Sequence, residues 1–442
     1  MAQELGGIRA ASILEGVRFT AQVAVPNVLQ GLFRRRRTLT GAATLVDADK
    51  QAVRLYEGLV RKFPDEPFYI RVGADMSLVV HRPDDIRTVL DGSPHPFAAD
   101  PDTKRKGMSH FQPDALTISR GALWENRRQF AEAVLDTGKP LHRLAQDFLA
   151  VAYEEADKLA ADELTWDRVN DAFRRLTRRV IFGDPAADDE ELSDLLGTLM
   201  DEANNTPSDE SKHFAPFMAK VTGYVEAAAP GSLASLVAAA PQNEDTHPAG
   251  QVIHWLFAMG DTLPANVFRA LAVLATHEQV RTLVRAELAG ADLETAGGVA
   301  GLGYLSACLQ EAMRLWPTTP LFGRVTTMDT TVRGVTVAEG TQVFIFNLGN
   351  HRNRDTIPYA DRFAPEAWTA GDAAQDWSFN FFSHGAQGCP GSGLSVFLGN
   401  AVLARLVQRA NPTLAGDRLR ADRPLPHTVD IFGLHIGLEA LD

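Results

Sequence analysis

The stretch FSHGAQGCPG, residues 382–391, is the most informative part of this 442-residue sequence. Its glycines allow sharp turns and a close approach of the backbone to a flat ligand, because glycine has no Cβ. The stretch presents Cys389 just before an apolar segment, 393–407, which is predicted to be a helix with Pro390 at its first position. Backbone N–H groups and a helix N-terminus lower the pKa of a nearby thiol. The stretch therefore predicts a metal–thiolate site, with a buried structural cysteine as the alternative.

A metal held by Cys389 must bring most of its other ligands with it. The only other cysteine is Cys308, which lies in a predicted helix, so the chain lacks the thiolates for a zinc or iron–sulfur site built from several cysteines. Haem iron held by one cysteine thiolate meets this requirement.

The spacing Phe-x-x-Gly-x-x-x-Cys-x-Gly, filled by Phe382, Gly385, Cys389 and Gly391, resembles the haem-binding loop of the cytochrome P450 monooxygenases. The resemblance implies that Cys389 binds the iron of haem b, iron protoporphyrin IX, and that Phe382 and Gly391 lie against the cofactor. One position departs from the family pattern. Gln387 stands where the family usually has Arg or His beside a haem propionate.

Three further residues are candidates to contact the haem propionates. Trp124 and Arg128 lie four residues apart, hence on one helix face, where an indole and a guanidinium can bind the same anionic, flat ligand. The pair is similar to the Trp-x-x-x-Arg of the family that contacts a propionate, and ordinary helix packing is the alternative. Arg324 resembles the second propionate-binding arginine of the family. Because Gln387 is not a cation, propionate binding is expected to depend mainly on Arg128 and Arg324. Arg127 is expected to point elsewhere, towards a redox partner.

The longest helical pattern, residues 250–277, contains an irregular centre. Gly260 costs roughly 1 kcal/mol relative to Ala in a helix, and Pro264 removes a backbone hydrogen bond, so the helix is predicted to kink there. The acid Asp261 and the hydroxyl of Thr262 lie side by side at this distortion, where they can hold water and pass protons. The alternative is an N-cap in a broken helix.

The same residues resemble the family motif Ala/Gly-Gly-x-Asp/Glu-Thr. Ala258 matches its first position and is expected to lie against the haem, while Asp261 and Thr262 match the acid and the alcohol that support dioxygen activation. Met259 stands where the family usually has Gly.

Another motif is expected to support the fold and not the chemistry. Glu311 and Arg314 lie three residues apart on a predicted helix and resemble the structural Glu-x-x-Arg ion pair of the family, which supports the haem loop. The family usually adds a further Arg where this chain has Ala367. Arg352 and Arg362 are the two candidates to replace it.

The resemblance implies a mainly α fold with a smaller β region, the cytochrome P450 fold, over nearly the whole chain beyond about residue 65. Residues 1–64 are expected to form an N-terminal extension with the first helices, and 65–442 the haem-thiolate monooxygenase domain, together as one domain. Further expectations are a helix over 304–316, a loop over 93–115, and hairpins from 68–72 with 76–80, from 331–337 with 341–346, and within 429–436.

The composition of the chain limits the classes of function that it can have. The net charge of −13 argues against a nucleic-acid binder, which needs a concentrated positive face. Two cysteines suit a reducing cytoplasm, and no apolar run reaches the length of a membrane span. Residues 8–33 are mildly amphipathic and lead into the run Arg34-Arg35-Arg36-Arg37. They are interpreted as a solvated or self-packed extension, with a membrane-surface anchor as the alternative.

The resemblance implies a monooxygenase that activates dioxygen to oxidise a hydrophobic small molecule in secondary metabolism. No dinucleotide-binding glycine motif and no iron–sulfur cysteine set is present, so ferredoxin and ferredoxin reductase are the expected electron donors. A peroxide-driven peroxygenase and a non-catalytic haem-binding scaffold are the alternatives; the first is disfavoured by the acid–alcohol pair at 261–262. The candidate substrate pocket comprises residues 108–111, 256–262, 318–322 and 431–432.

Overall fold

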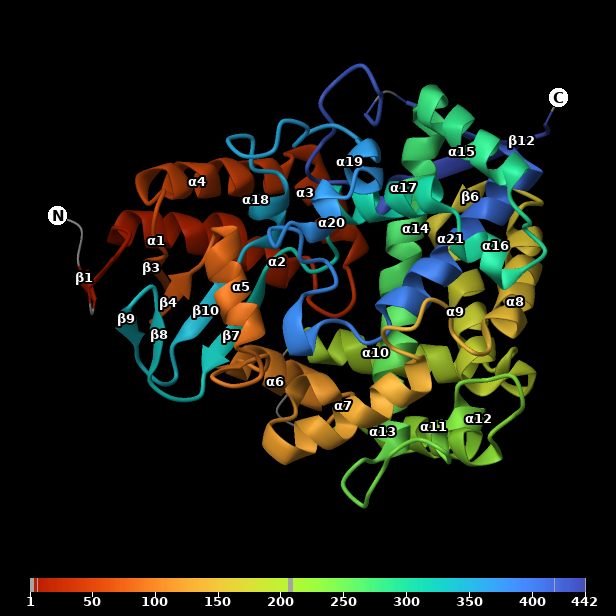
Figure 1. The fold of residues 1–442 in the computed structure, drawn as a ribbon, viewed down its shortest axis with the longest axis horizontal. Helices are drawn as coiled ribbons and strands as arrows, with labels where there is room; N and C mark the ends of the chain where they lie inside the picture. The colour runs from red at the N-terminus through yellow and green to blue at the C-terminus, as the bar shows by residue number, and fades with distance from the viewer. Residues whose placement is uncertain (1–3, 6, 206–209, 417, 442) are drawn as a thin grey trace. The chain divides into compact units, whose positions relative to one another are not determined.

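The computed structural model describes residues 4–5, 7–205, 210–416 and 418–441 (Figure 1). The chain divides into two compact units. Unit 1 comprises Met1–Arg105, Met313–Cys389 and Pro424–Asp430, and unit 2 comprises Lys106–Ala312, Pro390–Arg423 and Ile431–Asp442. Helices predominate and the strands are short, which confirms the predicted mainly α fold with a smaller β region. The expectation of a single domain stays a prediction.

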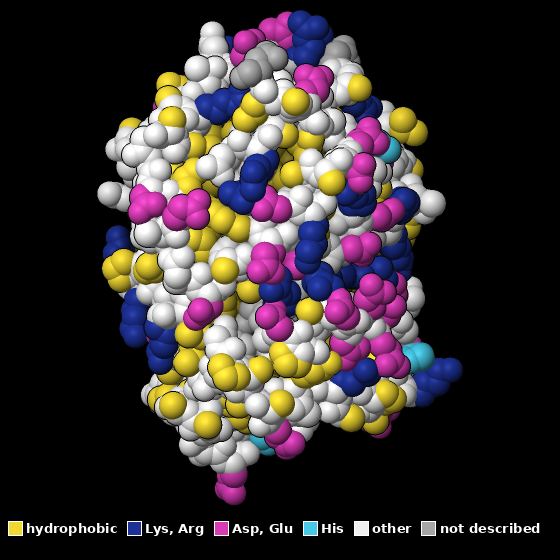
Figure 2. All heavy atoms as spheres, turned by 90° about the vertical axis from the view of Figure 1, so that its right-hand side faces the viewer, with side chains coloured by type: hydrophobic (Ala, Val, Ile, Leu, Met, Phe, Trp, Pro, Cys, Tyr) yellow, Lys and Arg dark blue, Asp and Glu magenta, His cyan; other side chains and the backbone are white. Residues whose placement is uncertain are grey.

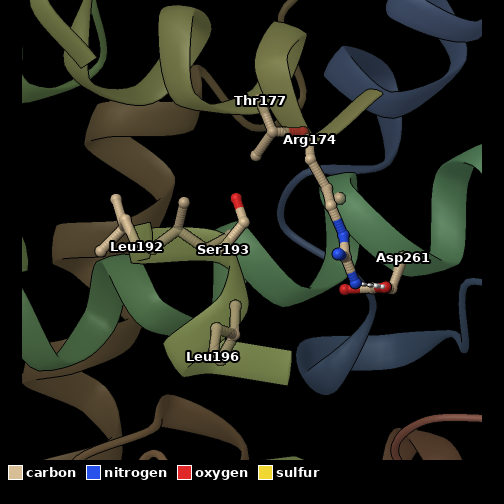
Figure 3. Close-up of a pocket in the computed structure, with 8 residues that line it drawn as sticks. Arg174, Thr177, Leu192, Ser193, Leu196 and Asp261 are labelled. Carbon is tan, nitrogen blue, oxygen red and sulfur yellow. Dashed lines mark hydrogen bonds and ion pairs between the residues drawn. The ribbon is translucent and has the colours of Figure 1, made fainter. Parts of the chain in front are cut away.

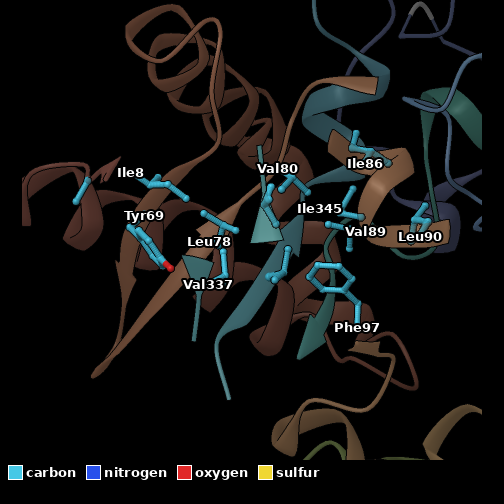
Figure 4. Packing of buried hydrophobic residues seen from close by; sticks show 13 residues of the cluster. Ile8, Tyr69, Leu78, Val80, Ile86, Val89, Leu90, Phe97, Val337 and Ile345 are labelled. Atoms are coloured by element: carbon cyan, nitrogen blue, oxygen red, sulfur yellow. The ribbon is translucent and has the colours of Figure 1, made fainter. Parts of the chain in front are cut away.

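Unit 1 contains a five-stranded sheet with the order β3-β4-β10-β7-β5. Only β4 and β10 run parallel; the other neighbours are antiparallel. Because side chains alternate between the two faces of a strand, Tyr69 and Leu78 pack with α5 on one face (Figure 4), while Phe68 and Ile70 pack with α4 on the other. The strands are β3 (Phe68–Val72), β4 (Asp75–Val79), β5 (Phe97–Ala98), β7 (Phe322–Thr326) and β10 (Gln342–Ile345).

The helices of unit 1 are mostly short. The N-terminal helices enter the sheet's second hydrophobic cluster through Phe19 and Val23, which are 0% and 1% exposed. The elements are α1 (Ile13–Phe19), the π-helix η1 (Thr20–Ala24), α2 (Val25–Leu29), α3 (Arg37–Leu45), α4 (Ala48–Lys62), α5 (Pro83–Asp91), α18 (Asn347–His351), α19 (Glu366–Thr369), α20 (Asp372–Gln375) and the 3-10 turn η5 (Gly385–Gln387), besides the two-stranded β1 (Glu4–Leu5) and β2 (Ile8–Arg9).

The hairpin expected from residues 68–72 and 76–80 is confirmed as β3 and β4, but the second expected hairpin is wrong. Residues 331–337 form two strands, β8 (Thr330–Val332) and β9 (Val335–Val337), which pair with each other. The turn between them holds Arg333 and Gly334 at positive φ, the geometry of a tight two-residue hairpin turn. Residues 342–345 pair instead with β4 and β7, strands that lie far from each other in the sequence.

Unit 2 is mainly helical. The long predicted helices are present, and 304–316 is confirmed as α17 within one residue at each end. The helices are η2 (Leu116–Ile118), α7 (Gly121–Leu135), α8 (Ala145–Leu159), α9 (Trp166–Phe182), η3 (Asp184–Ala186), α10 (Glu190–Ala203), α11 (Phe214–Ala227), α12 (Ala234–Val237), α13 (Pro248–Phe257), the π-helix η4 (Ala258–Thr262), α14 (Leu263–Thr276), α15 (Glu278–Gly290), α16 (Ala296–Ala300), α17 (Gly303–Leu315, ending in unit 1), α21 (Ser392–Arg409) and η6 (Ile431–Gly433).

Two other expectations about local structure are wrong. Residues 93–115 are not only loop, since they contain β5 and α6 (Asp102–Ser109), whose first residue is an acid that favours a helix N-terminus. Residues 429–436 do not form a hairpin, because 431–433 close a 3-10 turn. The following strand β12 (His435–Glu439) pairs with β11 (Asn411–Leu414) and β6 (Leu164–Thr165).

The surface carries both signs of charge. On the side of Figure 1 where the C-terminus is marked, acidic and basic side chains are interspersed over the face drawn in Figure 2. Among the described residues, no helix is both long and apolar enough to cross a membrane.

Candidate functional site

The cysteine loop of unit 1 is closed by its own backbone. The Cys389 N–H donates to the Phe382 carbonyl at 2.8 Å, and the Gly388 N–H donates to the Gly385 carbonyl at 2.9 Å. Cys389 is half-buried, and its thiol forms no disulfide. Main-chain hydrogen bonds therefore determine where the thiol lies, so its position does not depend on one side-chain contact.

Gly385 is required by this geometry. Its φ is 69°, in the left-handed region that L side chains rarely adopt, and a Cβ there would overlap the Leu90 carbonyl of α5. The predicted glycine-rich turn is thus explained by a close approach of the loop to a helix.

The helix after the loop begins later than expected. Its N-cap is Gly391 and its first residue is Ser392, so Pro390 precedes the helix and does not occupy its first position. The Pro390 carbonyl accepts a hydrogen bond from Thr137 Oγ1 at 2.7 Å, which replaces a helical bond. In unit 2, a Cβ added to Gly391 would lie 3.7 Å from Leu135 Cδ1.

Arg324 lies on β7 with a buried charge. Its side chain donates to the hydroxyls of Ser93 (3.0 Å) and Ser383 (3.3 Å) and to the Gly323 carbonyl, with no carboxylate among these described partners. Burial lowers the pKa of Arg324 to about 10, which still leaves the guanidinium charged at neutral pH. A buried cation that contacts only neutral groups fits a ligand that brings its own carboxylate.

One neighbouring feature of unit 1, a second cation, agrees with that fit, whereas another feature, an amide oxygen, is an acceptor and does not itself bind a carboxylate. Burial lowers the pKa of Lys104 to about 7, and the charge of Arg324 lowers it further; the Lys104 ammonium donates to the Ala99 carbonyl at 2.9 Å. In the cysteine loop, the Gln387 Oε1 atom is buried without a hydrogen-bond partner. Lys104 was missed in the sequence, because a single lysine in a short helix gives no signal.

Arg314 connects α17 to the coil that follows α18. Its guanidinium donates to the carbonyls of residues 351 and 360 at 2.7 and 3.2 Å, and of 359 and 362 at 3.4 and 3.0 Å. Glu311, one turn earlier, is fully buried like Arg314. Of the two candidates to replace the arginine missing at Ala367, Arg352 is fully buried and pairs with Asp361 at 2.8 Å, whereas Arg362 is exposed. The structure therefore favours Arg352.

His351 extends this network towards the cysteine loop. Its Nε2 accepts the N–H of Asn380 at 2.9 Å, and its Nδ1 lies 3.2 Å from the Arg314 carbonyl, to which the neutral ring donates. Burial, followed by the nearby Arg314 charge, lowers the pKa of His351 to about 3, so the ring is neutral at physiological pH. This contact of His351 was not predicted from the sequence.

In unit 2, α7 carries the Trp124–Arg128 pair. Arg128 is largely buried and its Nε donates to Glu132 Oε1 at 2.7 Å. Arg127 does not reach the surface as expected: it is 5% exposed and donates to the Asp114 carboxylate and the Ser119 hydroxyl, both at 2.9 Å. Its role is therefore internal, and the suggested contact with a redox partner is wrong.

The irregular centre of the helix over 250–277 is confirmed as a π-helical turn. It covers Ala258–Thr262, so α13 and α14 are separated by one widened turn. Such a turn leaves a carbonyl without its usual helical partner, and here Asn170 Nδ2 of α9 donates to the Gly260 carbonyl at 2.7 Å. Asn170 is 94% buried, hence the amide supports the turn from inside unit 2.

Asp261 lies in this turn and forms an ion pair. Arg174 Nη2, also from α9, is 3.1 Å from Asp261 Oδ1 (Figure 3). Both residues line a cavity of about 10 Å³, close to the smallest volume that holds one water molecule. Thr177 Oγ1, buried without a hydrogen-bond partner, lines the same cavity. A water in this position would be bound by a carboxylate and a hydroxyl.

Asn170 and Arg174 were missed in the sequence. They lie four residues apart, on one face of α9, but their partners are 90 and 87 positions further along the chain. No local pattern indicates such contacts.

The structure brings some candidate pocket stretches together. Phe111 and Phe257 form an edge-on pair with ring centroids 6.0 Å apart, which joins stretches 108–111 and 256–262. Phe432 packs edge-on against Trp166 at 5.9 Å. Residues 318–322 belong to unit 1, whereas these two contacts are within unit 2.

The sequence-predicted residues are thus divided between the units. Unit 1 holds Phe382, Arg324 and Cys389, and unit 2 holds Trp124, Arg128, Ala258, Asp261, Thr262 and Gly391. Among the described residues, no group of three His, Cys, Asp or Glu side chains is placed to hold a metal ion.

Comparison with known proteins supports one family. A family model described as Cytochrome P450 matches residues 234–421. Cytochrome P450 81F4 of Arabidopsis thaliana is 24% identical over 394 residues, covering 77% of this chain and 78% of the relative. Cytochrome P450 4c3 of Drosophila melanogaster is 28% identical over 38% of this chain, and cytochrome P450 monooxygenase sphH of Aspergillus fumigatus is 31% identical over 41%.

The last two matches span only about a third of the relatives' own length, 32% and 36%. The cofactor of the family is haem b, and the buried Arg324 and the presented thiol of Cys389 fit its carboxylates and its iron. The matched region includes both the π-helical turn and the cysteine loop. The family-model match and these relatives support the assignment of this chain to the cytochrome P450 family.

Proposed function

We propose that this chain is a haem-thiolate monooxygenase that uses dioxygen to hydroxylate or otherwise oxidise a hydrophobic small molecule. The observation that carries the proposal is the backbone-closed loop that presents the Cys389 thiol, with the Cys389 N–H bonded to the Phe382 carbonyl at 2.8 Å. When bound, a haem iron held by a cysteine thiolate supplies the activation of dioxygen.

The residues of unit 1 have binding roles in this proposal. The Cys389 thiolate is the protein ligand of the iron, and Phe382 covers the sulfur side of the cofactor. Arg324 binds a propionate, with Lys104 as a second cation, because both charges are buried and lie near each other. Gln387 can donate one neutral hydrogen bond where the family usually has a cation.

In unit 2, Trp124 and Arg128 bind a propionate, and Ala258 and Gly391 lie against the cofactor. Asp261 and Thr262 have the catalytic roles. The overall reaction, RH + O2 + 2 e⁻ + 2 H⁺ giving ROH + H2O, consumes two protons that the protein must deliver. Asp261 borders a cavity with the volume of one water molecule, which supports its role in passing these protons inward.

The two electrons come from separate proteins in this proposal, namely ferredoxin and ferredoxin reductase. This proposal is supported by the 442-residue sequence, in which neither a dinucleotide-binding glycine motif nor a cysteine set for an iron–sulfur cluster is found. Neither Cys308 nor Cys389 forms a disulfide, which suits the reducing cytoplasm that we propose as the location.

The substrate is proposed to be a hydrophobic molecule of secondary metabolism. The candidate pocket stretches place aromatic rings, Phe111 with Phe257, beside the π-helical turn that contains Asp261. Aromatic side chains bind apolar ligands by dispersion and by removing apolar area from water.

The test compares two ways of driving turnover. The purified full chain is supplied with an apolar ligand found by a spectral screen, and product is measured with ferredoxin, its reductase and NADPH, and separately with hydrogen peroxide. The monooxygenase proposal expects turnover with the electron chain at a higher rate than with peroxide. Turnover with peroxide alone would show a peroxygenase, and haem binding without turnover in either assay would show a scaffold.

Replacing Arg324 with Ala is expected to reduce haem retention strongly. Removing one partner of a buried charged hydrogen bond costs roughly 2–5 kcal/mol, so the affinity for haem is expected to fall by at least about tenfold. Arg128→Ala is expected to have a smaller effect, because Arg128 already shares its charge with Glu132. The measurement is the ratio of haem to protein after gel filtration.

The matched control for this prediction is Arg362→Ala, which removes an exposed arginine from the same unit. Full haem content in both Arg324→Ala and Arg128→Ala would show that the propionates are bound by other residues.

A further inference from the structure

Exposed apolar side chains are concentrated at one place in the chain. Among the described residues, thirteen large hydrophobic side chains are exposed, and all but three of them lie between residues 13 and 46. The three others, Leu283, Met328 and Leu441, are scattered. We call the concentrated group the N-terminal face; its members are Ile13, Leu14, Val17, Val25, Val28, Leu29, Leu32, Leu39, Leu45 and Val46.

Side chains of the N-terminal face lie on the outer side of helices whose inner side is already buried in the core. Residues 13–29 form one continuous helical segment, α1, η1 and α2. Phe19 and Val23 point into the core of unit 1, whereas Ile13, Leu14 and Val17 are 75%, 69% and 59% exposed. A surface helix needs only one apolar side to pack on its core, so a second apolar side on the same segment indicates a second contact.

The charge of this region has the opposite sign to that of the whole chain. Residues 13–46 contain five arginines, Arg18 and Arg34 to Arg37, and one acid, Glu15, which gives a net charge of +4 against −13 for the chain. The acid is paired with Lys62 of α4 at 2.8 Å. Arg18 of α1 and Arg37 of α3 are exposed, whereas Arg34, Arg35 and Arg36 are half-buried.

We propose that the N-terminal face docks on the surface of an anionic lipid bilayer, with its helices lying in the plane of the headgroups. Apolar side chains that enter the acyl boundary and arginines that meet anionic headgroups are the two components of interfacial helix binding. The inference stands independently of the proposed function.

A lipid surface fits these observations better than a protein partner. The apolar side chains belong to three successive helices, α1, α2 and α3, and to residues that follow α2 and α3. An apolar area with a surplus of arginine and little acid matches the layered chemistry of an anionic bilayer, in which charge lies outside and hydrocarbon inside.

The test uses the full chain and two kinds of vesicle, phosphatidylcholine alone and phosphatidylcholine with phosphatidylglycerol. We expect the protein to sediment with the anionic vesicles, to bind the neutral vesicles more weakly, and to be partly released by high salt. The double variant Leu14→Glu with Val17→Glu is expected to reduce the bound fraction at least about tenfold, because it removes two apolar side chains from the interface.

The control replaces exposed apolar residues elsewhere, Leu283→Glu with Met328→Glu, and is expected to bind like the wild type. Thermal unfolding checks that each variant is folded, and Val28→Glu serves as a second variant if the first unfolds. Absence of vesicle binding, or binding unchanged by the variants, would overturn the proposal. It would be overturned equally if sedimentation analysis found a self-associated protein that the variants convert to monomer without any vesicle binding.

Discussion

Replacing Cys389 with serine is expected to abolish the carbon monoxide difference band that marks a thiolate-ligated haem in the reduced protein. A serine hydroxyl has a far higher pKa than a thiol and does not supply a soft, anionic ligand to iron. The loop itself is expected to keep its shape, because the Cys389 N–H, not the thiol, bonds to the Phe382 carbonyl. Turnover driven by the electron chain is expected to disappear together with the band.

The second cysteine of the chain provides the control. Cys308 is fully buried in α17, and Cys308→Ala is expected to keep the band with only some loss of stability, since it removes one small core side chain. Circular dichroism establishes that Cys389→Ser is folded. A folded Cys389→Ser protein with an unchanged band would disprove thiolate ligation by this residue.

Replacing Asp261 with asparagine is expected to lower turnover with dioxygen and the electron chain by at least about 10²-fold, the usual contribution of a positioned acid–base group. The reaction with hydrogen peroxide, RH + H2O2 giving ROH + H2O, brings its own protons and electrons. It is therefore expected to be affected much less. The measurement is the product formed per haem in the two assays.

The Arg174→Met variant distinguishes a role of Asp261 in proton delivery from a role in structural support. This change breaks the same 3.1 Å ion pair but leaves the carboxylate of Asp261 in place, so it is expected to keep most of the turnover driven by electrons. Asp194→Asn, at an exposed acid on α10, is the matched control for a lost negative charge. An equal fall in both assays for Asp261→Asn would mean that Asp261 supports the fold of the site and does not relay protons.

Local chemistry made several parts of the fold predictable. The helix at 83–91 begins with Pro83 and is capped by Gly92, and the helix at 303–315 ends before Pro317, because proline and glycine act within their own turn. The β3–β4 hairpin was predictable for the same reason, since its turn is a short glycine-containing segment between two β-rich runs.

Strand pairing between distant segments was not predictable in this way. Residues 342–345 are compatible with a hairpin to the preceding strand, yet they pair in parallel with β4 and antiparallel with β7. Side-chain alternation indicates that a segment is a strand, but it does not say which of several apolar strands is its neighbour.

The residues of the candidate site can be divided in the same way, into those that local sequence predicts and those that it does not. Cys389, the irregular turn at 258–262 and the Glu311–Arg314 spacing are visible in the sequence, because each depends on residues within a few positions of one another. The choice of Arg352 over Arg362, the internal role of Arg127, and the support of the π-turn by Asn170 and Arg174 needed the tertiary structure.

The sequence by itself determined that this chain is mainly helical and that it presents one cysteine thiol from a glycine-rich loop. The tertiary structure decided which charges are buried and which side chains meet, as with Arg324 beside Lys104 and Arg174 beside Asp261. The physical reason is that these two contacts join segments far apart in the sequence, so their energies depend on how the whole chain packs.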